Sequence, residues 1–360
     1  MYIHLSIAII IVLVIKSSVA TIDVCKLCQC SGDLTLINCD KKGLQNLNDI
    51  DFPSNVKTLT LINNNLTFNT INDRIKIESL PKLTNLILNQ NPLEIIPPFN
   101  IRTLQFLSLE DTLLTSAEFP TSHNNSSLQR VSLSNNKIHS INETDFLVLH
   151  NSQLTELSLK NNQLKSCEFL LNLPRLYSIN LDKNQFTSLP EQLTTPGKIR
   201  NYSFMHNFIT VIDETSPLNV WLKNNYTNMK IYLANNSLDC CLSLWFIRFL
   251  KVSSPQIVGD ASLLTCTGPL NFAGKLLIDL NPDEMNCHND ITKKPRVIGI
   301  ISGFIGIIII SIVAVFIWNQ RRPLRSGYRE IDGIDESYGG PAFPISDEEI
   351  QQAAVIPNIH

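Results

Sequence analysis

Two kinds of residue in this chain have types and spacing that could support chemistry: clustered cysteines and asparagines in glycosylation sequons. Nine cysteines occur in 360 residues. The spacing Cys25-x-x-Cys28-x-Cys30, with Cys39 following, suits either disulfide bonds or tetrahedral zinc ligation. A second group consists of Cys240, Cys241, Cys266 and Cys287. Thiols oxidise in the secretory pathway and stay reduced in the cytosol, so the choice between the two chemistries depends on the compartment.

Several asparagines begin an Asn-x-Ser/Thr sequon without an intervening proline, which is the acceptor signal for N-linked glycans. They are Asn65, Asn124, Asn125, Asn142, Asn201, Asn225 and Asn235. The adjacent Asn124 and Asn125 are not expected both to carry a glycan. An asparagine-rich chain also produces such triplets by chance, so the sequons favour an extracellular location without requiring it.

No catalytic motif accompanies these residues. The seven histidines are scattered, and the sequence contains neither a His-Glu-x-x-His nor a Gly-x-Ser-x-Gly motif, and no phosphate-binding glycine loop. The formal net charge of −3 does not favour a nucleic-acid partner. We therefore predict a protein that is not an enzyme, with no metal, no cofactor and no nucleic-acid partner.

The first residues indicate the compartment. Residues 5–15 form an apolar run that is too short to cross a bilayer, and Ser18-Val19-Ala20 supplies the small residues that a signal peptidase needs. We expect a signal peptide over residues 1–20. An uncleaved anchor is the alternative, because no lysine or arginine precedes the apolar run and Lys16 follows it. Entry into the secretory pathway favours disulfides over zinc for the cysteine groups.

An eleven-position phrase recurs along the central region that positions these residues. It reads Leu128-x-x-Val131-x-Leu133-x-x-Asn136-x-Ile138, with apolar residues at places one, four, six and eleven and asparagine at place nine. Its eight copies begin at Val56, Leu83, Leu104, Leu128, Leu154, Leu176, Ile199 and Asn228. The third copy carries Thr112 at place nine. The steps between copies vary from 21 to 29 residues, which predicts returning arcs of variable length.

The physical meaning of the phrase follows from strand geometry. Places four and six lie two residues apart, so on a strand both side chains point to the core, while places two, three, five and seven surround them. The asparagine amide both donates and accepts hydrogen bonds, so at place nine it can satisfy backbone groups of neighbouring repeats that would otherwise be buried without partners. We therefore predict a stacked ladder of asparagines.

The phrase resembles the leucine-rich repeat, whose period of about 20–29 residues supplies one short strand and a returning arc. This resemblance implies an α/β solenoid, a leucine-rich repeat horseshoe, with about eight repeats over residues 56–238. The cysteine groups resemble the N-terminal and C-terminal caps of extracellular members of the family, here over residues 21–55 and 239–290. Cys240 and Cys241 adjoin, whereas the family usually places one residue between them.

The caps imply a disulfide pattern. By resemblance the bonds are Cys25–Cys30, Cys28–Cys39, Cys240–Cys266 and Cys241–Cys287. Cys167 is left over, and a buried inert thiol and an intermolecular bridge are both open for it.

The region after the second cysteine group suggests a membrane anchor. Val297 to Trp318 carries no charge and would make about 33 Å of helix, so it predicts one transmembrane helix after a juxtamembrane segment at 291–296. Gly299 and Gly303 share a helix face and could admit a second helix as a dimer, although glycine is common in membrane helices. Residues 319–360 predict a disordered cytoplasmic tail.

Two tyrosines in the predicted tail fit short signals. Tyr328-x-x-Ile331 resembles an endocytic sorting signal, and Tyr338 follows acidic residues as in tyrosine kinase sites. Such short patterns also arise by accident. The complete expectation is a single-pass type I protein of the plasma membrane, with its N-terminus extracellular.

These features favour a cell-surface receptor or adhesion protein that binds an extracellular or cell-surface protein ligand through its solenoid. An accessory subunit that modulates a channel or receptor through its membrane helix is one alternative, and a shed or decoy binder is another. The expected contact residues on the concave sheet are Phe106, Glu110, Arg130, Glu156, Lys160, Tyr177 and Asp182. An ordinary solvated sheet is the competing interpretation, and a glycan on Asn201 would obstruct the C-terminal end.

Overall fold

A computed structural model describes residues 22–120, 127–142, 144–253 and 257–287. The chain divides into two units, Met1–Thr292 and Lys293–His360, and the second lies wholly outside the described residues. The expected signal peptide, transmembrane helix and tail, with Gly299, Gly303, Tyr328 and Tyr338, therefore also lie outside them, as do Asn124 and Asn125. Within the described ranges, no helix has both the length and the apolar character needed to cross a membrane.

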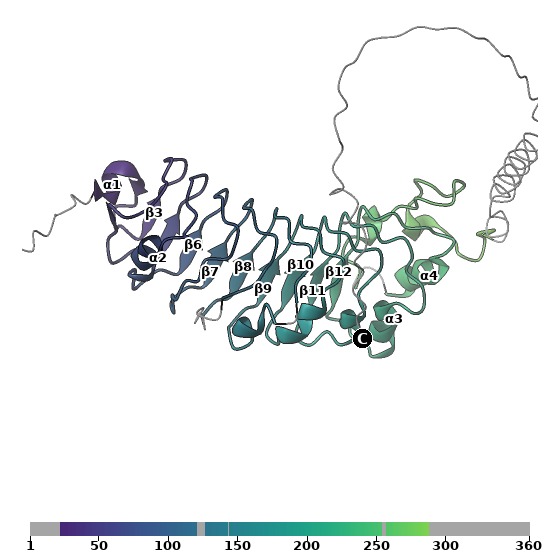
Figure 1. The fold of residues 1–360 in the computed structure, drawn as a ribbon. Coiled ribbons are helices and arrows are strands. Elements are labelled where there is room, and N and C mark those ends of the chain that lie inside the picture. The colour runs from purple at the N-terminus through teal and green to yellow at the C-terminus, as the bar shows by residue number, and fades with distance from the viewer. Residues whose placement is uncertain (1–21, 121–126, 143, 254–256, 288–360) are drawn as a thin grey trace, which may run out of the picture. The chain divides into compact units, whose positions relative to one another are not determined.

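A ten-stranded sheet runs along the first unit in the order β12-β11-β10-β9-β8-β7-β6-β5-β3-β2 (Figure 1). Its strands are β2 (Gln29–Cys30), β3 (Leu36–Asn38), β5 (Thr58–Thr60), β6 (Asn85–Ile87), β7 (Phe106–Ser108), β8 (Arg130–Ser132), β9 (Glu156–Ser158), β10 (Ser178–Asn180), β11 (Asn201–Ser203) and β12 (Lys230–Tyr232). All neighbours pair in parallel except β2 and β3.

Strands β5 to β12 occupy places three to five of the eight copies of the phrase, and the register pairs place four with place four. Leu59 opposes Leu86, for example, and Leu86 opposes Leu107. The side chains at places four and six are buried in every repeat, and Leu157 and Leu159 are typical. Stacking therefore buries one continuous apolar core that no repeat could bury alone.

The arcs opposite the sheet contain short helices. The longest steps hold α2 (Ile71–Glu78) and α3 (Pro217–Lys223), and other arcs hold the 3-10 turns η1 (Leu147–Leu149), η2 (Glu168–Asn172) and η3 (Glu191–Thr194). Ser216 begins α3 by accepting a hydrogen bond from the Leu218 N–H. Trp221 of α3 is fully buried, and its Nε1 donates to the Leu193 carbonyl at 2.7 Å. This contact joins neighbouring arcs.

The asparagines at place nine form the predicted ladder. Asn162 Nδ2 donates to the carbonyl of Leu133 in the preceding repeat and to Leu159 in its own repeat, each at 3.0 Å. Its Oδ1 accepts the Ile138 N–H at 3.0 Å. The same pattern recurs at Asn64, Asn91, Asn184, Asn207 and Asn236. Each asparagine thus joins two successive repeats.

Thr112 modifies the ladder where asparagine is missing. Its hydroxyl donates to Asn136 Oδ1 at 2.7 Å, and its N–H donates to the same oxygen at 3.1 Å. In the regular pattern, the N–H of Leu93 would donate a hydrogen bond to the side-chain oxygen of an asparagine at position 112. Here the Leu93 N–H donates to the Asn91 carbonyl at 2.8 Å instead. A local turn therefore satisfies the N–H that the ladder would otherwise serve.

Disulfide bonds fasten both ends of the sheet. The structure contains Cys25–Cys30, Cys28–Cys39, Cys240–Cys266 and Cys241–Cys287, which are the pairs that the family resemblance implies. At the N-terminal end, α1 (Val24–Leu27) lies between β1 (Ile22–Asp23) and β2, and β1 pairs with β4 (Ile50–Asp51). Cys167 is free and buried.

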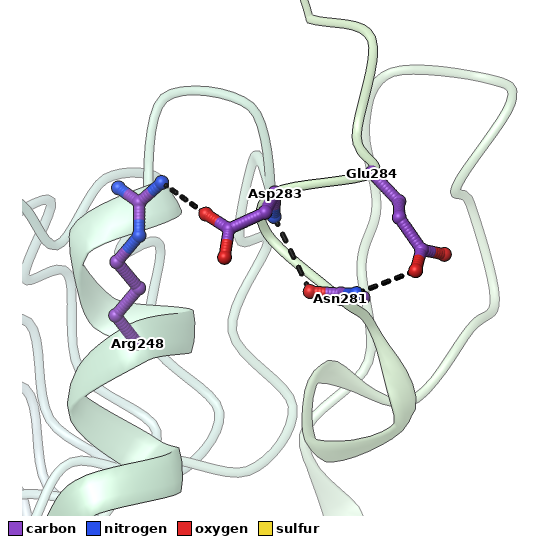
Figure 2. Close-up of polar contacts among 4 residues, drawn as sticks. All are labelled: Arg248, Asn281, Asp283 and Glu284. Atoms are coloured by element: carbon purple, nitrogen blue, oxygen red, sulfur yellow. Dashed lines mark hydrogen bonds and ion pairs between the residues drawn. The ribbon is translucent and has the colours of Figure 1, made fainter.

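The C-terminal disulfide segment is built on α4 (Leu244–Ser253), η4 (Ala261–Leu263) and η5 (Leu277–Asp279). Figure 2 shows how the last described residues approach α4: Arg248 pairs with Asp283 at 3.0 Å, and Asn281 Nδ2 donates to Glu284 at 2.7 Å. Both members of the ion pair are largely exposed, so the pair orients the segment and adds little stability.

Candidate functional site

The candidate binding surface is the sheet face, which we define as the side chains at places three, five and seven of the strands. These places project from the side opposite the buried places four and six. Arg130, Glu156 and Lys160 are exposed there, and Phe106 and Glu110 are half-buried. The place-three row brings Phe106, Arg130 and Glu156 together on the neighbouring strands β7, β8 and β9.

Phe106 and Arg130 form a direct contact across two strands. The guanidinium carbon of Arg130 lies 5.1 Å from the centre of the Phe106 ring, within the range of a cation–π interaction. Such a contact stabilises an exposed pair by about 0.5–1 kcal/mol. It also holds the long arginine side chain over the ring, so less rotamer entropy is lost when a partner binds.

Three place-five serines on the neighbouring strands β7, β8 and β9 form a small polar surface, the serine floor, and each is hydrogen-bonded to the place-seven side chain of the preceding repeat. Ser108 donates to Asn89 Oδ1 at 2.7 Å, Ser132 donates to Glu110, and Ser158 pairs with Ser134 at 2.8 Å. The floor is therefore polar, and its small, hydrogen-bonded side chains leave room for a partner's backbone to approach closely.

Asp182 differs from its predicted role as a contact residue. Only 8% of it is exposed, and its Oδ1 accepts hydrogen bonds from Ser203 Oγ at 2.5 Å and the Met205 N–H at 2.8 Å. The carboxylate therefore joins β10 to β11 and stabilises the sheet. Glu110 also accepts from a neighbouring serine, but it stays partly accessible.

Tyr177 lies at the margin of the sheet face. It occupies place two, just before β10, and is 51% exposed. Its carbonyl accepts the Arg200 N–H at 2.8 Å, so it neighbours the corresponding place of the next repeat. The structure thus places Phe106, Arg130 and Glu156 in one row, with Glu110 and Lys160 at place seven and Tyr177 on the border.

Sequence reasoning missed two outward residues on β12. Lys230 at place three is exposed, and Tyr232 at place five is half-buried. A Cβ added to Gly259 would lie 2.5 Å from the Tyr232 ring, so this ring packs closely on the glycine backbone. Their positions at places three and five of the eighth copy are the signal that identifies both residues in the sequence.

The sequon asparagines fall on different surfaces. Asn65, Asn142, Asn225 and Asn235 are exposed, whereas Asn201 is half-buried on β11 at place three of the sheet face. A glycan on Asn201 would project from the sheet face beyond the row of Phe106, Arg130 and Glu156. Within the described ranges, no three His, Cys, Asp or Glu side chains gather as a metal site would require.

Comparison with known proteins supports one architecture. No family model matches the chain. The chain is 25% identical to Toll-like receptor 10 of Bos taurus over an alignment of 260 positions that covers 67% of the chain. It is 27% identical to trophoblast glycoprotein of Mus musculus over an alignment of 173 positions that covers 46% of the chain. The chain spans only 29% and 38% of the lengths of these relatives.

The crystal structure of human trophoblast glycoprotein superposes with a TM-score of 0.61 at 21% identity, covering 72% of this chain and 97% of that one. The fold is a leucine-rich repeat solenoid. The relatives are, by name, a receptor and a glycoprotein, and neither is named as an enzyme.

Proposed function

We propose that the chain is a cell-surface leucine-rich repeat protein, a receptor or adhesion molecule, that binds a protein ligand through the sheet face of an extracellular solenoid. Four disulfides and the sequons fit an oxidising, extracellular environment. The apolar sequence 297–318 supplies the single span of a type I plasma-membrane protein, and 319–360 is then cytoplasmic. The similarity to a receptor and a glycoprotein supports this class of protein.

The observation that carries the proposal is the row of Phe106, Arg130 and Glu156 beside the serine floor. A partly exposed aromatic ring next to exposed charged groups is the composition of interface hot spots, and Phe106 with Arg130 and Glu156 provides it. The cation–π contact at 5.1 Å favours one position of the Arg130 guanidinium, over the Phe106 ring. A protein ligand can stack on the ring, pair with both charges and bring its backbone close to the floor.

The test is ligand capture followed by substitution. Secreted protein comprising residues 21–290 is used to isolate a binding partner from cell-surface proteins, and alanine is then introduced at Phe106, Arg130, Lys160 and Tyr177. We expect Arg130→Ala and Tyr177→Ala to lose the most, about 1–3 kcal/mol each, with secretion unchanged. Glu191→Ala in η3, on the arc side, is the matched control and should bind like the parent. Normal binding by all four variants, with loss on arc-side changes, would defeat the assignment.

The alternative function, an accessory subunit that acts through its membrane helix, would depend on residues 297–318 and not on the sheet face. Gly299 and Gly303 would place a small-residue face against another helix, in a dimer or on a partner subunit. Function should then require the native span, and the ectodomain on a foreign anchor should fail. If the soluble ectodomain alone restores function, the shed or decoy alternative is favoured instead.

A further inference from the structure

A cavity of about 590 Å³ opens beside the margin of the sheet face, between the arcs of the sixth and seventh repeats. Residues 194–197, from the last residue of η3 onward, form one wall, and the other wall, ahead of β12, consists of Asn225, Tyr226, Asn228 and Met229. Arg200 joins the two walls, because its Nη1 donates to the Gly197 carbonyl at 3.1 Å and lies 3.8 Å from Met229 Sδ. The volume is within the range of about 300–1,000 Å³ typical of small-ligand sites.

The lining suits a carbohydrate. A sugar ring offers an apolar C–H face that can stack on an aromatic side chain, and hydroxyl groups that both donate and accept hydrogen bonds. The cavity supplies the Tyr226 side chain, which is 37% exposed, together with the Thr194 and Thr195 hydroxyls and the Asn228 amide. Among the described residues, the side-chain bonds of Arg200 all run from Nη1, so its remaining N–H groups can donate to a ligand.

One residue of the wall is also a point of covalent attachment. Asn225 begins the sequon Asn225-Tyr226-Thr227 and lines the cavity. Backbone hydrogen bonds hold this sequon in place, from the Tyr226 N–H to the Trp221 carbonyl at 3.0 Å and from the Thr227 N–H to the Asn225 carbonyl at 2.8 Å. Asn225 has a φ of 54°, a left-handed conformation that asparagine tolerates better than most residues.

We propose that the innermost sugars of an N-linked glycan on Asn225 occupy this cavity. The proposal rests on the proposed passage of the chain through the secretory pathway, where such glycans are added. A tethered sugar has a high effective concentration at the site, so weak contacts with Tyr226 and Arg200 are sufficient to hold it. The bound sugars join residues 194–197 to the segment before β12 and thereby link two successive arcs.

The position of this glycan also bears on ligand binding. The backbone of Arg200 is hydrogen-bonded to Tyr177, so the cavity borders the margin of the sheet face. A glycan held in the cavity limits access from the arc side near Tyr177, whereas a mobile glycan would sweep across it. Asn65 begins an exposed sequon in the first repeat and provides the comparison.

The experiment follows enzymatic deglycosylation of the full-length protein, site by site, by mass spectrometry. Under native conditions, a peptide N-glycosidase should release the Asn225 glycan at least about tenfold more slowly than the Asn65 glycan, because the sugars must first leave the cavity. If Asn65 is empty, Asn235 takes its place. After denaturation the two rates should be equal. Tyr226→Ser keeps the sequon and should raise the native rate at Asn225 to that of the comparison site.

Hydrogen exchange provides a second readout that does not depend on that variant. Asn225→Gln should increase exchange in residues 194–200, and Asn65→Gln should leave it unchanged. An unmodified Asn225 in a protein glycosylated elsewhere, or equal native release rates, overturns the cavity proposal alone. The absence of glycan at every sequon overturns both this proposal and the proposed extracellular location.

Discussion

Removing one asparagine of the ladder tests whether these side chains stabilise the solenoid. In Asn162→Ala, the buried N–H of Ile138 loses the Oδ1 that accepts its hydrogen bond at 3.0 Å. The carbonyls of Leu133 and Leu159 lose one bond each, but they keep the amide groups of Asn136 and Asn184. An orphaned buried donor costs about 1–3 kcal/mol, and each lost carbonyl bond costs about 0.5–1.5 kcal/mol.

The free energy of unfolding should therefore fall by about 2–5 kcal/mol, since these contributions are not strictly additive. The measurement is urea denaturation of secreted residues 21–290, with hydrogen exchange to detect partial unfolding of the solenoid. Gln163→Ala is the control, because that neighbouring amide is exposed; it should change the free energy of unfolding by less than about 0.5 kcal/mol. If Asn162→Ala loses no more than Gln163→Ala, the ladder is not a source of stability and this reasoning is refuted.

Four further predictions concern other parts of the molecule. Replacing the Cys241–Cys287 pair with serines should destabilise the solenoid by about 4 kcal/mol, against about 2 kcal/mol for Cys25–Cys30, because the bonds close sequence separations of 46 and 5 residues; equal losses in thermal melting would contradict this. Burial raises the pKa of Asp260 above its usual 3.8, so the contribution of this carboxyl to stability is full below pH 3.8 and is lost as the pH rises through the folded pKa; the stability of Asp260→Asn relative to the parent should therefore rise over that window, and a fall would reverse the sign. Burial also raises the pKa of the Cys167 thiol, which should resist iodoacetamide in the native protein at pH 8 and react after denaturation; native labelling would disprove this. Lys183 has a φ of 53°, in the left-handed region that asparagine adopts more readily than lysine, so Lys183→Asn should raise the free energy of unfolding by up to about 1 kcal/mol. A lower free energy of unfolding would show that contacts of the lysine side chain outweigh the backbone strain.

The repeats could be predicted from sequence because one buried pair of apolar residues and one buried asparagine recur with little variation. The same phrase also extends into the N-terminal disulfide segment, where β3 adds a ninth parallel strand. Ile37 and Cys39 stand at places four and six there, but Lys42 replaces the asparagine, so the copy was not recognised. Cys39 serves two purposes, as a buried core residue and as half of a disulfide bond.

Backbone conformation at place eight could not be anticipated from apolar spacing. All eight residues there have φ between 53° and 61°, and they include Gln90 and Lys183, which do not favour that conformation. The turn into the ladder asparagine imposes it. The buried role of Asp182 was missed for a related reason: an outward place can still be covered when the next strand supplies both a hydroxyl and an N–H. The identity of a ligand depends on the side chains of the sheet face. The repeated phrase fixes only the buried places, so it does not constrain those side chains.

The direction of the asparagine ladder sets a rule for building hybrid molecules from this scaffold. Each amide reaches back toward the N-terminus, so the loop of one repeat depends on the residue at place nine of the repeat that follows it. A foreign segment that replaces the repeats on the C-terminal side of a junction must therefore carry an asparagine at place nine of its first repeat. A foreign segment that replaces the repeats on the N-terminal side need only offer a backbone carbonyl and a backbone N–H in its last repeat for that asparagine to bond. At the junction between the second and third repeats, where Thr112 stands, the chain already tolerates a missing amide. This junction is the most permissive place to exchange one half of the solenoid for a foreign one.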